Sequence, residues 1–162
     1  EYTAGTLPPV MPIRTASQEV RAGVAICFDI IFDEQAVRMV DDGAGLILAQ
    51  TNNADFGRTD ESAQQLQIAR LRAVETGRAL VNISTVGTSA VVAPDGPSLA
   101  SLEPFTADAM VATVPLVAGA MPAIRFGAAI SATWMALGGA ALVAGAALLL
   151  RGRRAAALAE QL

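Results

Sequence analysis

The chain has 162 residues, of which 53% are hydrophobic and 16% charged, and its mean hydropathy is +0.47. This apolar fraction is higher than an average soluble domain carries, so part of the chain is expected to lie out of water. The formal net charge of −4, from 11 basic and 15 acidic residues, excludes the basic surface that a nucleic-acid-binding protein requires.

The chain contains few kinds of side chain that could act as a nucleophile, a base or a metal ligand. A single cysteine, Cys27, rules out an intrachain disulfide, and the absence of histidine rules out His-based catalytic dyads, triads and imidazole metal sites. All 11 basic residues are arginine, which stays protonated and is a poor general base. A cysteine nucleophile in this chain therefore lacks a lysine partner, and neither a metal nor a cofactor is predicted.

The first segment, Glu1 to Gln18, is rich in Pro, Thr and Gly and predicts a loop. It has no initiating Met and none of the charged and apolar regions of a signal peptide. We therefore expect the sequence to be a fragment of a longer chain.

The next segments predict a strand, a helix and a second strand. Val20 to Asp29 is an apolar run typical of a buried strand, with Cys27 near its end. Phe32 to Asp42 predicts a helix that Gly43 stops, and Leu46 to Ala49 predicts a short buried strand parallel to the first. From this local pattern Cys27 has two interpretations, a small buried hydrophobe or a nucleophile at a strand end.

A polar loop, Thr51 to Ser62, follows the second strand at the edge where open α/β sheets bind ligands. Asn52 and Asn53 are candidates either for ligand binding or for turn hydrogen bonds to the backbone. Both interpretations stay open at this point.

The strongest helical pattern is Glu61 to Thr76, with Gly77 after its last turn. Apolar residues recur at spacings of three and four, and they are Leu66, Ile68, Ala69, Leu71, Ala73 and Val74. The charged residues Arg70, Arg72 and Glu75 are expected on the solvated face, although the two arginines have the alternative of binding a phosphate or carboxylate.

Two further strands, Ala79 to Ser84 and Thr88 to Ala93, are separated by a hairpin signal at Thr85 to Gly87. Pro94-Asp95-Gly96 predicts a tight turn, and Met110 to Val114 predicts a last short strand.

The final part of the chain has the composition of a transmembrane helix. It is uncharged from Phe126 to Leu150, which at 1.5 Å per residue spans about 37 Å, against a hydrocarbon core of about 30 Å. Three arginines follow it and only Arg125 precedes it, which favours a cytoplasmic C-terminus. Trp134 is expected to pack between helices rather than anchor at the interface.

Small residues are spaced three and four apart on this segment, at Gly138, Ala141 and Gly145. Such spacing permits another helix to approach closely, as in a bundle, and a lone anchor is the alternative.

Four of these segments together resemble the apolipoprotein N-acyltransferases, the membrane-bound members of the nitrilase superfamily. They are Cys27-Phe28-Asp29, the loop with Asn52, Asn53, Phe56 and Gly57, the helix from Gln64-Gln65 through ARLRA to Gly77-Arg78, and the strand pair ending in Pro94-Asp95-Gly96. The helix is similar to that of actinobacterial members nearly residue for residue. The family usually has Glu where this chain has Asp29, so that carboxylate reaches one methylene less far.

The resemblance implies an α/β fold, namely part of a nitrilase-like αββα sandwich followed by one C-terminal transmembrane helix. Residues 1–120 would form the C-terminal part of the catalytic domain, residues 121–150 the membrane helix, and residues 151–162 a cytoplasmic tail. The catalytic domain would then lie outside the cytoplasm, on a cell-membrane protein that is multi-pass in full length. Half of such a sandwich leaves an open edge and face, so we do not expect it to fold alone.

The resemblance also implies an acyltransferase of lipoprotein biosynthesis. Cys27 would take an acyl chain from a phospholipid as a thioester and pass it to the amine of a diacylglyceryl-cysteine lipoprotein. The backbone N–H of Phe28 would serve as oxyanion donor and Asp29 as a supporting acid. Residues expected at the substrate are Asn52, Asn53, Phe56, Gly57 and Thr85. The glutamate base and the lysine of the family would come from the N-terminal portion of the longer chain, so this fragment is expected to be inactive alone.

Two other functions remain open. The first is a membrane-tethered nitrilase-type amidase, in which water replaces the amine, and the membrane helix argues against it because soluble amidases rarely have one. The second is a catalytically dead module that binds lipid or lipoprotein, which the aspartate at position 29 and the absence of His and Lys leave open.

Overall fold

The computed structural model describes residues 5–159. The chain divides into two compact units between Ile124 and Arg125, and each unit is described by itself.

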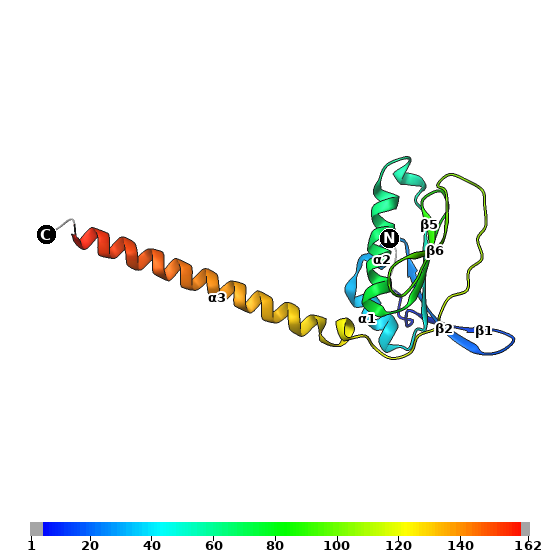
Figure 1. The fold of residues 1–162 in the computed structure, drawn as a ribbon, viewed down its shortest axis with the longest axis horizontal. Helices are drawn as coiled ribbons and strands as arrows, with labels where there is room; N and C mark the ends of the chain where they lie inside the picture. Colours follow the sequence, from blue (N-terminus) through cyan, green and yellow to red (C-terminus); the bar gives the residue numbers. More distant parts are fainter. Residues whose placement is uncertain (1–4, 160–162) are drawn as a thin grey trace. The chain divides into compact units, whose positions relative to one another are not determined.

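The first unit is built on one six-stranded sheet with its strands in sequence order. The strands are β1 Val10–Arg14, β2 Glu19–Ile26, β3 Leu46–Thr51, β4 Ala79–Ser84, β5 Ser89–Val92 and β6 Ser98–Leu102. Strands β2, β3 and β4 are parallel, whereas β1, β5 and β6 are added in antiparallel pairs. Figure 1 shows β1 beside β2 and β5 beside β6. The predicted parallel pairing of the first two long strands is therefore confirmed.

The helices follow the sequence pattern closely. After β2 comes the 3₁₀ helix η1, Cys27–Ile31, and then α1, Asp33–Asp41, within the range that the sequence predicts. A short 3₁₀ turn η2, Ala54–Phe56, precedes α2, Glu61–Thr76, whose bounds equal the predicted ones. Gly77 ends α2 in the left-handed conformation, with φ +64°, which costs glycine little.

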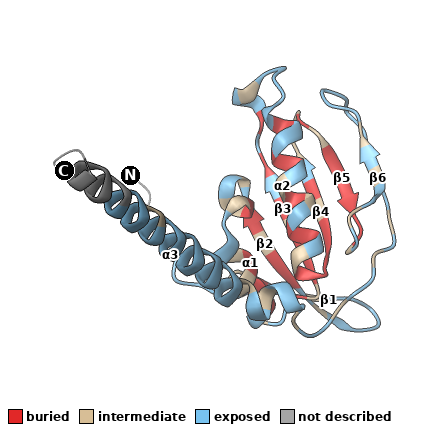
Figure 2. Cartoon of the chain, turned by 60° about the vertical axis from the view of Figure 1, so that its left-hand side comes forward, coloured by how far each residue is buried: buried red, intermediate tan, exposed pale blue. Residues whose placement is uncertain are grey.

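The core lies between the sheet and the two helices, which Figure 2 shows on one side of it. Buried α1 and α2 side chains pack against buried strand residues, and the cluster includes Met39, Leu66, Ala69, Ala73, Ile47, Leu80 and Val92. The expectation that Leu71 and Val74 belong to this face is wrong, since they are 53% and 44% exposed. The buried stripe of α2 instead runs through Ala69 and Ala73, which let the helix lie close to the sheet.

The opposite face of the sheet is only partly covered. Because side chains alternate along a strand, the neighbours of the helix-facing residues point to this face. Val24, Leu48 and Val81 lie side by side there in register and are half-buried, and Ile26 and Ile83 are 60% and 43% exposed. This second face is apolar.

Three of the predicted elements are wrong, and one strand, β6, was not predicted. The segment up to Gln18, expected to be a loop, contains β1, which pairs with β2 from Val10 opposite Gly23 onward; residues 1–4 of that segment lie outside the described residues. The strand expected to reach Asp29 ends at Ile26, because the chain turns at Cys27. Residues 110–114 form no strand, and β6 pairs with β5 as the outer strand instead. Where these strands begin and end depends on the strands with which they pair, and local composition does not predict that pairing.

The second unit consists of most of one long helix, α3, Pro122–Ala159. Its segment Pro122–Arg151 has a hydropathy of 1.8, so it is long and apolar enough to cross a membrane by length and composition. Its large apolar side chains are exposed, Trp134 by 70% and Leu142 by 77%. The predicted long apolar C-terminal helix is confirmed.

Candidate functional site

Cys27 lies where β2 ends and η1 begins, and it is half-buried. The thiol is therefore not one of the fully buried core residues. Its φ is +56°, in the left-handed region that only glycine enters freely. A non-glycine residue held there costs of order 1–3 kcal/mol, so neighbouring groups must hold the turn in place.

The turn lies at the edge of the sheet where three parallel strands end. Ile26, Gln50 and Ile83 are paired in register across β2, β3 and β4, so the residues that follow each of them gather at this edge. The sequence placed Cys27 and the Asn52–Asn53 loop at such an edge, and the observed register agrees.

Gln65, on the buried face of α2, joins the turn to the neighbouring strand. Its Nε2 donates to the backbone oxygen of Cys27 at 2.9 Å. Its Oε1 accepts from Asn53 Nδ2 at 2.8 Å and from Thr51 Oγ1 at 3.3 Å. Both the nitrogen and the oxygen of the Gln65 amide are therefore hydrogen-bonded, and the residue is only 6% exposed.

Asn53 continues the network to the β4–β5 turn and is 1% exposed. Its Oδ1 accepts from Ser84 Oγ at 2.5 Å, and Ser84 Oγ in turn accepts from the backbone N–H of Gly87 at 2.8 Å. Hydrogen bonds thus run without a break from the carbonyl of Cys27 to the turn between β4 and β5. The turn interpretation of Asn53 predicts hydrogen bonds to the backbone, whereas the observed bonds of its amide go to the side chains of Thr51, Gln65 and Ser84.

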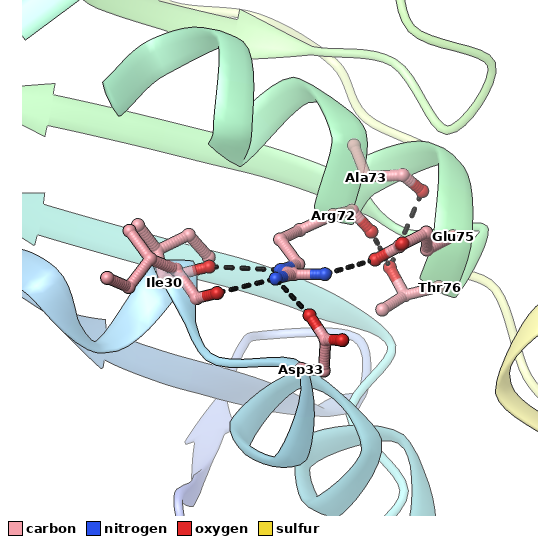
Figure 3. Close-up of polar contacts among 7 residues, drawn as sticks. Ile30, Asp33, Arg72, Ala73, Glu75 and Thr76 are labelled. Carbon is pink, nitrogen blue, oxygen red and sulfur yellow. Dashed lines mark hydrogen bonds and ion pairs between the residues drawn. The ribbon is translucent and has the colours of Figure 1, made fainter. Parts of the chain in front are cut away.

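Arg72 holds the other end of η1 and is 5% exposed. Its Nε and Nη2 donate to the carbonyls of Ile30 and Ile31 at 3.1 and 2.6 Å, and the guanidinium also pairs with Asp33 and Glu75 (Figure 3). The prediction that Arg72 lies on the solvated face is wrong, because η1 packs against that side of α2 and offers two carbonyls that need donors.

Phe28 and Phe56, the aromatic residues near Cys27, contact each other, whereas the carboxylate of Asp29 is hydrogen-bonded to the backbone. The rings of Phe28 and Phe56 meet edge to face with centroids 6.3 Å apart, which joins η1 to η2. Asp29 Oδ2 accepts from the backbone N–H of Ile26 at 3.1 Å, so this carboxylate caps the turn. Gly57 follows η2 with φ +57° and is exposed.

Asn52 and Thr85 form a separate exposed pair. Asn52 Oδ1 accepts from Thr85 Oγ1 at 2.8 Å and from the backbone N–H of Ala54 at 3.2 Å. Thr85 also lines a cavity of about 370 Å³ between the β4–β5 turn and the segment that includes Phe105 and Met110.

Arg78, at the end of the sheet away from Cys27, is a buried cation bound by carbonyls. Its Nε donates to Ala44 O at 3.0 Å and its Nη1 to Thr76 O at 2.5 Å. Burial lowers the pKa of the Arg78 guanidinium, because desolvation disfavours the charged form. Within residues 5–159 no group of three His, Cys, Asp or Glu side chains could hold a metal ion.

The sequence alone assigned no role to Gln65 or Ser84, and it placed Arg72 on the solvated face. The available signal was on α2, where Gln65 lies four residues before Ala69 and Arg72 seven residues after Gln65, on the same apolar stripe. A polar residue in the phase of a buried stripe needs a buried partner. Which partner it finds depends on what packs against the helix.

Comparison with known proteins gives one family and one group of relatives. A model of the carbon-nitrogen hydrolase family matches residues 2–120. The apolipoprotein N-acyltransferase of Nitrosomonas europaea is 34% identical over 143 residues, which are 88% of this chain and 28% of that protein. The protein of the same name from Ralstonia nicotianae is 38% identical over 154 residues, 93% of this chain and 28% of its own length. The chain therefore spans less than a third of these relatives.

One solved structure supports the fold. A carbon-nitrogen hydrolase from Helicobacter pylori G27 matches with a TM-score of 0.52 and 21% sequence identity, over 64% of this chain and 42% of that one. This likeness concerns the fold alone, and it confirms the predicted mixed α/β sheet of nitrilase type, present here in part.

Proposed function

The chain belongs to the carbon-nitrogen hydrolase family, and from that membership we propose that it is the C-terminal part of an apolipoprotein N-acyltransferase with Cys27 as its nucleophile. The observation that carries the proposal is the placement of the thiol. Cys27 is half-buried in a left-handed turn at the carboxyl end of β2, beside the ends of two further parallel strands. Strain of this kind persists at sites where geometry matters more than stability.

In the first half-reaction the Cys27 thiolate attacks the ester carbonyl of a phospholipid. A C–S bond forms and the ester C–O bond breaks, so the acyl chain is held as a thioester and the lysophospholipid leaves with a proton. The backbone N–H of Phe28 faces the oxyanion, since the first N–H groups of a helix have no acceptor within it. In the second half-reaction the lipoprotein amine attacks the thioester carbonyl, an amide C–N bond forms and the C–S bond breaks, and the proton that the amine loses passes through the general base to the departing thiolate.

The remaining groups come from the longer chain. The sequence contains neither histidine nor lysine, and it spans 28% of a relative's length, so the general base and the lysine partner are assigned to a part of the longer chain outside this segment. The half-covered sheet face with Val24, Leu48 and Val81 supports the same assignment, because an apolar surface of this kind needs a partner layer. Asp29 acts in this proposal by capping the Cys27 turn, and Asn52, Phe56, Gly57 and Thr85 border the substrate.

The test uses membranes that contain the full chain and a phospholipid with a labelled acyl chain. We expect hydroxylamine-sensitive label on the tryptic peptide 22–38, which holds Cys27, and its transfer to a diacylglyceryl-cysteine peptide. The Cys27→Ala variant should retain no label. Label that passes only to water would indicate the amidase instead, and an intact protein that is never labelled would exclude the nucleophile and favour a binding module.

We further propose that α3 spans the cell membrane with residues 1–120 outside the cytoplasm. Three arginines, Arg151, Arg153 and Arg154, follow the apolar segment, whereas Arg125 alone precedes it.

Intact spheroplasts treated with a membrane-impermeant maleimide should label Cys27 without permeabilisation. As a control, a Gln161→Cys change in the Cys27→Ala background should react only after permeabilisation. The reverse pattern would contradict the proposed orientation.

A further inference from the structure

We propose that Gln65 is a positioning residue for the oxyanion donor of the proposed acyl transfer, on which this inference rests. One peptide group joins Cys27 to Phe28 and contains both the Cys27 carbonyl and the Phe28 N–H. That peptide is trans and planar, so the carbonyl of Cys27 and the N–H of Phe28 are fixed in opposite directions. A group that fixes the carbonyl therefore fixes the N–H as well.

Gln65 is the group that fixes this carbonyl. Its Nε2 donates to Cys27 O at 2.9 Å, and Oε1 is held by donors from Asn53 and Thr51, so the amide cannot rotate without losing three hydrogen bonds. The residue is nearly fully buried, and the backbone that carries it is in the middle of α2. The N–H of Phe28 is accordingly aimed away from α2.

The hydrogen bond from Gln65 to the Cys27 carbonyl is needed because the backbone at Cys27 is strained. Cys27 at φ +56° would relax toward negative φ if its carbonyl were released, and this rotation would swing the Phe28 N–H away from the oxyanion. Arg72 does not prevent that movement, since its contacts are with the carbonyls of Ile30 and Ile31 at the far end of η1. The two α2 side chains thus have separate tasks, one at each end of the turn.

The test separates attack by the thiolate from stabilisation of the oxyanion. Alkylation of Cys27 by iodoacetamide needs the thiolate but forms no oxyanion, whereas acylation from the labelled phospholipid needs both. In the full chain, Gln65→Met keeps the side-chain length and removes the donor. We expect its alkylation rate to stay within about threefold of wild type and its acylation rate to fall about 10- to 100-fold, with KM for the lipid unchanged.

The neighbouring glutamine provides a matched control. Gln64 lies on the exposed face of α2, so Gln64→Met should leave both rates unchanged. If Gln65→Met is acylated at the wild-type rate, or if alkylation falls as much as acylation, the positioning role is overturned. If wild type is alkylated but never acylated, the proposed function fails and this role fails with it.

A second variant keeps the test decisive if Gln65→Met does not fold. Gln65→Glu has the same shape, and its protonated form can donate to Cys27 O while its ionised form cannot. The partners of Gln65 are Thr51, Asn53 and the Cys27 carbonyl, and none of these groups titrates. Alkylation and acylation both need the Cys27 thiolate, so the acylation rate is divided by the alkylation rate of the same variant at each pH.

Relative to wild type at each pH, this quotient should rise for Gln65→Glu as the pH falls from about 8 to 5. A quotient that stays flat or declines would overturn the role.

Discussion

Arg72→Met is expected to lower the free energy of unfolding of the unit that contains η1 by about 3–5 kcal/mol. The guanidinium is the donor for the carbonyls of Ile30 and Ile31 and the partner of the half-buried Glu75, and methionine leaves all three without it. The ion pair with Asp33 adds little, because that carboxylate is 82% exposed and well screened. The measurement is urea unfolding of the detergent-solubilised full chain, followed by pulse proteolysis.

Two comparison variants show whether the buried contacts are responsible. Arg70 lies two residues earlier on α2 and binds Gly96 O and Ser98 Oγ at a more exposed position, so Arg70→Met should cost about 1 kcal/mol. Arg72→Lys keeps the charge but not the two-pronged geometry, and its stability should lie between wild type and Arg72→Met. Equal losses for Arg70→Met and Arg72→Met would contradict this account.

Gly87→Ala is expected to destabilise the same unit by about 2–3 kcal/mol and to reduce acylation of Cys27. A Cβ at Gly87 would lie 2.6 Å from Asn53 Oδ1 and 2.8 Å from Ser84 Oγ, and would clash with Ser62 Oγ as well. Asn53 is bonded to Ser84 and Gln65, and Ser62 Oγ accepts from the backbone N–H of Thr88, so none of these groups can move without breaking a hydrogen bond. Steric exclusion, and not an unusual φ, is what requires glycine here.

Gly45→Ala is the matched glycine control. Its Cβ would meet only ordinary contacts at 3.8 Å, so the substitution should change the free energy of unfolding by less than about 1 kcal/mol. Both variants are measured by the same pulse proteolysis, and acylation is measured with the labelled phospholipid. If Gly87→Ala is as stable as Gly45→Ala, the network around Asn53 is looser than the structure indicates.

Local sequence patterns predicted a helix or strand well where the residues that determine it all lie within one segment of the chain. The bounds of α2 follow from its apolar spacing and from Gly77, and the uncharged composition of α3 predicts a long apolar helix without any contact. β1 and β6 were missed because an outer strand is defined by pairing with a distant neighbour, here β2 and β5. Met110 to Val114 has a strand-like composition and no partner among the described residues.

The features of the site likewise divide into those that the local sequence predicts and those that it does not. The placement of Cys27 at a strand end could be predicted, as could the gathering of the loops at that edge, because parallel strands end together. The tasks of Asn53 and Arg72 could not, since each depends on what lies across from it. Asn53 is buried by α2 and the β4–β5 turn, and Arg72 is buried by η1.

The sequence by itself therefore determined the class of fold, the long apolar helix, the single thiol and the lack of a histidine or lysine partner for it. Only the tertiary structure decided the left-handed turn at Cys27 and the hydrogen bonds from Gln65 and Arg72 that hold its two ends. The physical reason for this division is how far apart along the sequence the interacting residues lie. Helical and strand periodicity is set within a few residues, whereas these bonds join residues about 40 positions apart, and packing alone brings such residues together.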